Sequence, residues 1–128
     1  MRSFAALRMT IKGENIMKKI EAIIRPSKVG EVCKALHKVG HPGLMVTEIE
    51  GHGKQKGMTK TLRGKEYKVE FMTKTKLDIV AKDEEVENLV QAIRKAAYTG
   101  EVGDGKIFIS SVEDAIRIRT GEKGVLVV

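Results

Sequence analysis

Met17-Lys-Lys-Ile-Glu-Ala-Ile-Ile-Arg-Pro26 is the stretch that decides the fold. Within it Ile20, Ala22 and Ile24 fall on one face at a spacing of two, which is typical of a strand with one buried side. Arg25-Pro26-Ser27 ends the alternation, and an apolar stripe at helical spacing follows as far as Gly40. The stripe consists of Val29, Val32, Cys33, Leu36 and Val39. The sequence therefore predicts a strand over residues 18–25 followed directly by a helix.

Two further strands are predicted downstream, with a long polar segment between them. Leu44 to Glu50 is rich in β-forming residues and ends at Gly51-His-Gly53. Lys54 to Glu66 shows neither apolar period, so we expect a long exposed loop there. From Tyr67 to Ala81 one face carries aromatic, aliphatic and threonine side chains at every second position, which predicts a long strand.

A second helix and a fourth strand complete the pattern. Asp83 is the expected N-cap of a helix that ends near Gly100, and strands are expected over 107–112 and, briefly, 116–119. The resulting order β-α-β-β-α-β predicts an α+β, ferredoxin-like sandwich. In this fold both helices lie on one face of a four-stranded antiparallel sheet, and the long loop joins its second and third strands.

Composition favours a single globular domain with one basic segment. The chain has 128 residues, 41% hydrophobic and 32% charged, which is one ordinary domain in size and make-up. It has no apolar run long enough to cross a membrane, so we expect no membrane insertion, and the lone Cys33 fits a reducing cytoplasm. The net charge is +7, and most of the excess lies in the segment from Lys54 to Lys68. We therefore expect no direct nucleic-acid partner for the domain as a whole.

Residues 1–16 are expected to be an N-terminal extension to a domain over 17–128. Their basic character weakly resembles an organelle transit segment. The alternative, which we prefer, is that Met17 is the true start, since Lys12-Gly-Glu14 can be encoded by a purine-rich run like a bacterial ribosome-binding site.

The turn Gly103-Asp-Gly-Lys106 is the main candidate for chemistry. Two glycines allow backbone N–H groups to approach an anion, and Lys106 supplies a countercharge, so the turn suits a phosphate. Arg117 and Arg119 share a strand face, where guanidinium groups could bind a second phosphate. The structural alternatives are a tight turn with a solvated lysine and an ordinary solvated strand face.

Several motifs in register resemble one family. They are Met17 to Pro26, Gly51-His-Gly-Lys-Gln-Lys-Gly57, Arg63-Gly-Lys-Glu-Tyr67, Thr99-Gly-Glu-Val-Gly-Asp-Gly-Lys-Ile-Phe108 and Arg117-Ile-Arg-Thr-Gly121. From Met17 to Glu122 the chain resembles the PII nitrogen-regulatory signal proteins without gaps. The resemblance implies a homotrimer that binds ATP or ADP between subunits, and 2-oxoglutarate together with Mg²⁺. It also implies a regulator rather than an enzyme, acting on partner proteins through loop 53–67.

The resemblance also assigns site residues by position. The phosphates would meet Gly103, Asp104, Gly105 and Lys106, with Arg117 and Arg119 reaching in from a neighbouring subunit. Val80 would lie near the adenine, and Lys54 with Gln55 would close the cleft. Gln55 and Lys74 match the positions that hold 2-oxoglutarate, and an amide oxygen of Gln55 is a suitable ligand for the hard Mg²⁺ ion.

Some positions depart from the family pattern. Tyr67 matches a tyrosine that some relatives carry as a uridylylation target, although its alternative role is the first inward residue of strand three. Leu62 stands where a tyrosine is common, Lys65 replaces a small residue that is a phosphorylated serine in some relatives, and Met45 replaces a threonine that commonly touches the nucleotide.

Two other classes of function compete with a regulator. An RNA-binding module shares the topology but needs aromatic stacking residues on its middle strands, and aromatics are only 4% of this chain. A phosphoryl-transfer enzyme needs a base or an acceptor, and none is legible. The partner is also open: the resemblance is compatible with an ammonium channel, a glutamine synthetase, an adenylyltransferase or a sensor kinase.

Overall fold

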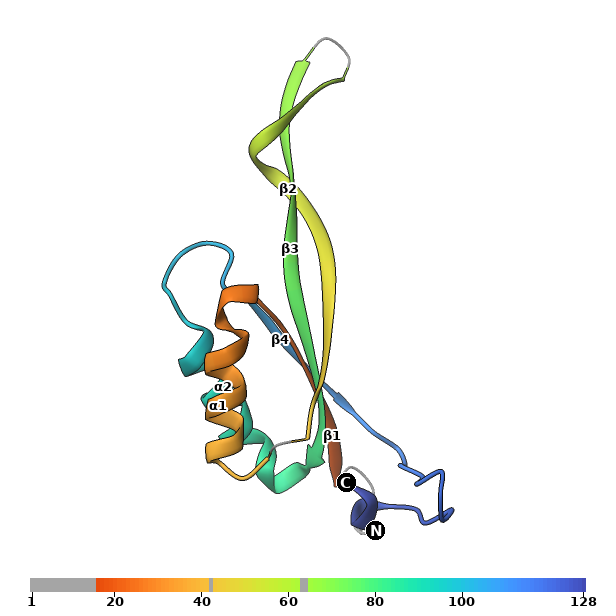
Figure 1. Ribbon diagram of the computed structural model, residues 1–128. Helices are drawn as coiled ribbons and strands as arrows, with labels where there is room; N and C mark the ends of the chain where they lie inside the picture. The colour runs from red at the N-terminus through yellow and green to blue at the C-terminus, as the bar shows by residue number, and fades with distance from the viewer. Residues whose placement is uncertain (1–15, 42, 63–64) are drawn as a thin grey trace, which may run out of the picture.

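The chain folds into a four-stranded antiparallel sheet with both helices on one of its faces (Figure 1). The computed structural model describes residues 16–41, 43–62 and 65–128, and for 51–62 and 65–72 it describes the course of the backbone alone. The strand order is β2-β3-β1-β4, with β1 at Met17–Ile24, β2 at Met45–Leu62, β3 at Lys65–Lys82 and β4 at Gly105–Ser111. The predicted ferredoxin-like α+β fold is confirmed.

β1 is an inner strand because it alternates apolar residues and pairs on both sides. It lies antiparallel to β3, with Ile20 opposite Ile79, and antiparallel to β4, with Ile20 opposite Ile109. The predicted inward residues Ile20, Ala22 and Ile24 are at most 1% exposed. They pack with the inward residues of β3 and with the helices in one core, formed by Ile20, Ala22, Ile24, Val32, Leu36, Leu77, Ile79, Ala81, Leu89, Ile93 and Ala97.

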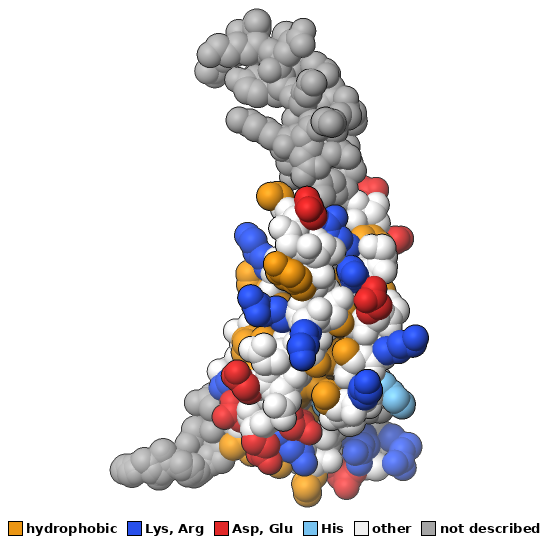
Figure 2. Space-filling model, turned by 90° about the vertical axis from the view of Figure 1, so that its left-hand side faces the viewer, with side chains coloured by type: hydrophobic (Ala, Val, Ile, Leu, Met, Phe, Trp, Pro, Cys, Tyr) orange, Lys and Arg blue, Asp and Glu red, His pale blue; other side chains and the backbone are white. Residues whose placement is uncertain are grey.

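Each helix begins with a short 3-10 turn. Pro26–Lys28 leads into α1 at Val29–Lys38, and Asp83–Glu85 leads into α2 at Val86–Ala97. The predicted N-cap at Asp83 is one residue late, because the Glu85 carboxylate accepts the Lys82 N–H at 3.1 Å and Asp83 already lies inside the first turn. The helices bury Val32 and Leu36 from α1 and Leu89 and Ile93 from α2. Figure 2 views this side of the molecule and shows charged side chains of both signs on it, as expected of solvated helix faces.

The segment Lys54 to Glu66 is the main difference from the sequence prediction. Instead of an irregular loop, β2 and β3 continue as a long hairpin, with Leu62 paired to Lys65 and a register shift between Lys54 and Met58. Figure 1 shows the hairpin projecting beyond the helices and the other two strands. A two-stranded ribbon satisfies its backbone groups by cross-strand hydrogen bonds and needs no apolar period to do so, so the absence of that period did not reveal it.

The chain after β4 also differs from prediction. No strand forms over 116–119 in the described part of the chain; Ile116 makes a single bridge with Lys123, and a turn lies between them. The Gly121 N–H donates to the Arg117 carbonyl at 2.7 Å, and the Arg117 N–H donates to the Glu122 carbonyl at 2.8 Å. The segment turns back on itself because Gly121, at φ +76°, takes a conformation that suits a turn.

Candidate functional site

The Gly103–Lys106 turn follows α2, its last two residues begin β4, and one carboxylate closes it. Asp104 Oδ2 accepts the backbone N–H groups of Thr99 at 2.8 Å and Gly100 at 2.9 Å. Its Oδ1 accepts the Thr99 hydroxyl and the Arg25 Nε–H, the latter at 3.1 Å. The Thr99 hydroxyl is the largest of the influences that hold the pKa of Asp104 well below its usual range, followed by the Thr99 N–H. The carboxylate therefore shapes the turn.

Two cations bind the carbonyl side of the turn. Arg25 donates from Nη2 to the Val102 carbonyl at 3.0 Å, and Lys74 donates from Nζ to the Gly103 carbonyl at 2.5 Å. Partial burial and the nearby Arg25 charge lower the pKa of Lys74. Lys74 was expected to bind 2-oxoglutarate, and it does lie against the expected phosphate turn. Sequence reasoning missed Arg25, which it interpreted only as the end of a strand.

The N–H side of the turn is open. Among the described residues, no hydrogen bond uses the backbone N–H of Val102, Gly103 or Asp104. Successive unpaired N–H groups in a turn form a concavity that suits an anion. Phosphate binding by the turn stays a prediction, and these N–H groups are the local feature that could provide it.

The two glycines serve different purposes. Gly103 has φ +104°, and a Cβ there would lie 3.3 Å from Arg25 Nη2, so the residue keeps the turn close to its cation. Gly105 has φ +109°, and a Cβ there would lie 1.7 Å from the Ile23 carbonyl oxygen. Gly105 is thus needed for the close pairing of β4 with β1, and its approach to an anion stays a prediction.

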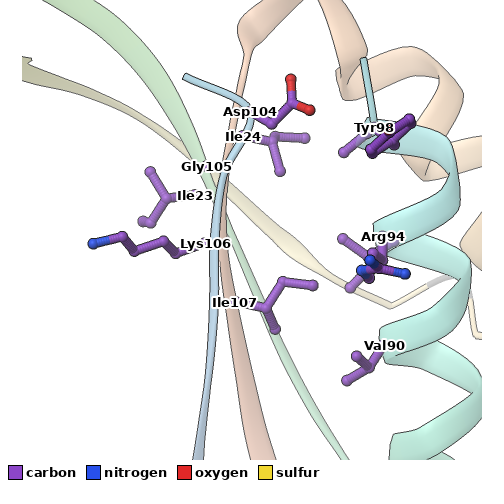
Figure 3. Close-up of a pocket in the computed structure, with 11 residues that line it drawn as sticks. Ile23, Ile24, Val90, Arg94, Tyr98, Asp104, Gly105, Lys106 and Ile107 are labelled. Carbon is purple, nitrogen blue, oxygen red and sulfur yellow. The ribbon is translucent and has the colours of Figure 1, made fainter. Parts of the chain in front are cut away.

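Three of the expected ligand residues share the sheet face that no helix covers. Lys74 and Val80 alternate along β3 with the buried residues Thr75, Leu77, Ile79 and Ala81. Lys106 is exposed and pairs with Ile23, and Figure 3 shows both side chains pointing away from α2. The strand register therefore brings Lys74, Val80 and Lys106 to one surface.

A separate pocket of about 340 Å³ lies on the helix side of β4 (Figure 3). Val90 and Arg94 of α2 and Tyr98, which directly follows the helix, line one wall, and Ile24 and Ile107 project towards them. This pocket is therefore on the other side of the strand from the Lys106 side chain.

The structure does not bring Arg117 and Arg119 to the turn within one chain. Gly105 pairs with Ile24 at one end of β1, whereas Ser111 pairs with Lys18 at the other, and the two arginines follow Ser111 (Figure 1). Arg117 forms an ion pair with Glu122, and Arg119 is exposed. Because the predicted strand over 116–119 is a turn, the expectation that the two arginines share a strand face is wrong.

The remaining predicted residues are only partly described. Lys54, Gln55 and Tyr67 lie on the hairpin backbone, and their side chains are outside the described residues, as are those of His52, Leu62 and Lys65. Met45 is described and is 62% exposed. Within the described ranges, no group of three or more histidine, cysteine, aspartate or glutamate side chains could hold a metal ion, and no helix there is long and apolar enough to span a bilayer.

The described residues form a ferredoxin-like domain whose glycine turn presents unpaired backbone N–H groups, and comparison with known proteins gives its family. The model of the family "Nitrogen regulatory protein P-II" matches residues 17–122. The chain belongs to that family.

Related sequences align with this chain over nearly their whole length. The chain is 56% identical to the nitrogen regulatory protein P-II of Azospirillum brasilense over 108 residues, which are 84% of this chain and 96% of the relative. It is 52% identical to the nitrogen regulatory protein P-II 2 of Methanothermobacter thermautotrophicus, covering 84% of this chain and 94% of that one. These relatives are named as regulators, and the expectation of a regulator rather than an enzyme is confirmed.

Solved structures also superpose on this chain. B. subtilis GlnK superposes with a TM-score of 0.73 at 31% identity, covering 88% of this chain and 98% of that one. Arabidopsis thaliana PII bound to citrate superposes with a TM-score of 0.71 at 39% identity, covering 86% of this chain and 90% of that one.

Proposed function

We propose that this protein senses nitrogen and energy status by binding ATP or ADP, and 2-oxoglutarate with Mg²⁺. The observation that carries the proposal is the turn itself: unpaired N–H groups at Val102 to Asp104, with Lys74 on its carbonyl side and Lys106 next in sequence. A site with fixed N–H donors and two ammonium groups suits a ligand with several negative charges. A nucleotide phosphate chain and a dicarboxylate both meet that description.

The nucleotide is proposed to lie along the face that no helix covers. Its phosphates would meet the backbone of Gly103, Asp104 and Gly105 and the ammonium of Lys106. Val80 would contact the adenine, because it is partly buried on the same face. Lys106 lies level with Lys76 through Ile23, so Val80 is four residues further along the sheet, a span of about 13 Å. That span leaves room for an extended nucleotide, with Lys54 and Gln55 closing over it.

The 2-oxoglutarate is proposed to bind beside the phosphates at Lys74. The Lys74 ammonium is already held against the turn and needs little movement to accept a carboxylate. Gln55 would supply an amide oxygen to Mg²⁺, alongside phosphate and keto-acid oxygens. The relative from Arabidopsis thaliana was solved with citrate, which supports a family preference for polycarboxylates.

A homotrimer is proposed, with each site shared between two subunits. In a single chain Phe108 is 54% exposed and Ile109 is 50% exposed on the edge strand β4. An apolar, unpaired strand edge is usually covered in the assembled protein. A second copy would cover it, and could also bring its Arg117 and Arg119 to the turn of the first.

The β2–β3 hairpin is the segment through which the protein is proposed to act on its partners. 2-Oxoglutarate would favour hairpin conformations in which Gln55 reaches the metal, and partners would bind another set of conformations. The partner classes remain those of cytoplasmic nitrogen assimilation: an ammonium channel, a glutamine synthetase, an adenylyltransferase or a sensor kinase. Tyr67 lies on this hairpin and is a proposed site of uridylylation.

Calorimetry with Mg-ATP, with and without 2-oxoglutarate, tests the proposal. We expect Mg-ATP to bind alone and to raise the affinity for 2-oxoglutarate, and 2-oxoglutarate to raise the affinity for Mg-ATP by the same factor. Lys74→Gln should weaken Mg-ATP binding to some extent, because Lys74 also holds the Gly103 carbonyl, and should lose most of the 2-oxoglutarate response. Intact Mg-ATP binding with no heat from 2-oxoglutarate in the native chain would reject the sensor.

One observation favours the RNA-binding alternative. Phe108 is half-exposed on the face that no helix covers, where Lys106 and Lys76 also lie. A single aromatic residue on an edge strand gives less stacking than the usual modules, which use two or three bases on the sheet. A salt-sensitive shift of single-stranded RNA that persists in saturating Mg-ATP would support this alternative over the sensor.

A further inference from the structure

Arg25 connects the end of β1 to the far side of the anion-binding turn. Its side chain donates to the Asp104 carboxylate at 3.1 Å and to the Val102 carbonyl at 3.0 Å, although these residues are 79 and 77 positions away in sequence. The side chains of Arg25 and Asp104 are 29% and 25% exposed, so the ion pair is partly shielded from water. An ion pair at this depth holds its geometry better than one on the open surface.

The backbone of Arg25 is itself held in place. The residue directly follows β1, which pairs with a strand on each side, and directly precedes Pro26, which starts the 3-10 turn. Its φ of −66° and ψ of 137° are extended, as the residue before a proline prefers. The guanidinium therefore projects from a fixed point and can define where the turn lies.

The carbonyl contacts fix the direction of the N–H groups. In a planar trans peptide the C=O and the following N–H point in opposite directions. With the Val102 carbonyl directed at Arg25, the Gly103 N–H must point away from Arg25. With the Gly103 carbonyl directed at Lys74, the Asp104 N–H must point away from Lys74.

We propose that Arg25 is a positioning residue for nucleotide binding. By holding the Val102 carbonyl and the Asp104 carboxylate, it keeps the turn N–H groups aimed at a phosphate before the ligand arrives. Lys74 supports the same geometry from the next carbonyl. The inference rests on the proposed nucleotide-binding function and adds to it a residue that prepares the site without touching the ligand. Preorganised donors bind an anion more tightly because binding does not have to order them.

Three variants test this role. Arg25→Gln removes the charge and the two-pronged donor; Arg25→Lys keeps the charge but reaches only one of the two acceptors. Lys28→Gln is the matched control, because it also removes one positive charge near the end of β1 and its ammonium pairs with Glu31 instead of the turn. Calorimetry with Mg-ATP should show about a tenfold or greater loss for Arg25→Gln. A smaller loss is expected for Arg25→Lys, and no change for Lys28→Gln.

A second measurement separates positioning from direct contact. If Arg25 acts through Asp104, then Arg25→Gln should weaken Mg-ATP binding much less in an Asp104→Asn background than in the native chain. If Arg25 instead touched the phosphate, the two losses would multiply. The amide signals of Gly103 and Asp104 in ¹⁵N spectra of the ligand-free protein should also move in Arg25→Gln and stay in Lys28→Gln.

The outcomes distinguish this inference from the proposed function. A native chain that binds no nucleotide defeats the proposed function. A native chain that binds Mg-ATP, while Arg25→Gln binds it equally well with unmoved amide signals, overturns the role of Arg25 alone. Should Arg25→Gln fail to fold, Arg25→Lys tests the positioning role by the same two measurements, the affinity for Mg-ATP and the amide signals of Gly103 and Asp104.

Discussion

Gly105 is the residue at which the fold and the site depend most directly on the absence of a side chain. Its positive φ and its close approach to the Ile23 carbonyl mean that Gly105→Ala must displace backbone rather than a flexible side chain. We expect a loss of more than about 2 kcal/mol in the free energy of unfolding. Gly30→Ala is the control: Gly30 lies in α1 with open space around it, so a gain of about 0.5–1 kcal/mol is expected. Urea unfolding measures both, and equal effects would contradict the argument.

Asp104 should make the free energy of unfolding depend on pH. Its pKa is lowered in the folded chain, whereas in the unfolded chain it is about 3.9. A lowered folded pKa contributes stability that is fully present above the unfolded value and is lost progressively as the pH falls from there through the folded pKa. Asp104→Asn cannot titrate, so native chain and variant should differ by a constant free energy of unfolding from about pH 6 to 8, and this difference should shrink below about pH 4. Urea unfolding at each pH tests this, and a difference as large at pH 3 as at pH 7 would contradict it.

At the scale of elements, the free energy of unfolding should depend on the buried residues of α2 and not on those of its exposed face. Ile93 is fully buried in the core, so Ile93→Ala should lower the free energy of unfolding by about 2–5 kcal/mol. Gln91 lies on the exposed face of the same helix, and Gln91→Ala should change it by less than about 0.5 kcal/mol. Guanidinium unfolding at one protein concentration measures both, since assembly makes stability concentration-dependent. A comparable loss for both variants would show that α2 is not held by this stripe.

The elements that could be predicted from the sequence are those that bury one face. Most inward positions of β1, β3 and both helices carry an apolar residue, with Thr75 of β3 a polar exception, so spacing alone located these elements. The hairpin beyond Lys54 could not be predicted in this way, because its pairing depends on cross-strand backbone hydrogen bonds rather than on an apolar face.

Only the parts of the candidate site that are contiguous in the sequence could be predicted. The turn is a contiguous run of glycines with a lysine, so its chemistry is visible in the sequence. The Arg25 contacts with Val102 and Asp104 are not, because they join residues nearly eighty positions apart and depend on the fold bringing them together. The same holds for the close packing of Gly105 against the Ile23 carbonyl of β1.

At the scale of the whole molecule, one chain holds the two halves of the proposed nucleotide site at opposite ends of β4. The turn lies at the Gly105 end of β4, while Arg117 and Arg119 follow Ser111 at the other end. The seven residues of β4 span about 20 Å, which is too far for one phosphate chain to contact both ends of a single subunit. If both halves bind the same nucleotide, they must come from different copies.

Mixing two variants tests this sharing. Lys106→Gln damages the turn half and Arg119→Gln the arginine half, so each alone should bind Mg-ATP about tenfold or more weakly. In trimers assembled from an equal mixture, about a quarter of the sites pair an intact turn with an intact arginine from the neighbour and should regain native affinity. Lys106→Gln mixed with Lys106→Ala is the control, because neither chain has an intact turn and no site can recover. Native mass spectrometry verifies that subunits have exchanged, and calorimetry counts the restored sites. Exchanged trimers without any restored sites would mean that each chain binds the nucleotide without its neighbour's arginines.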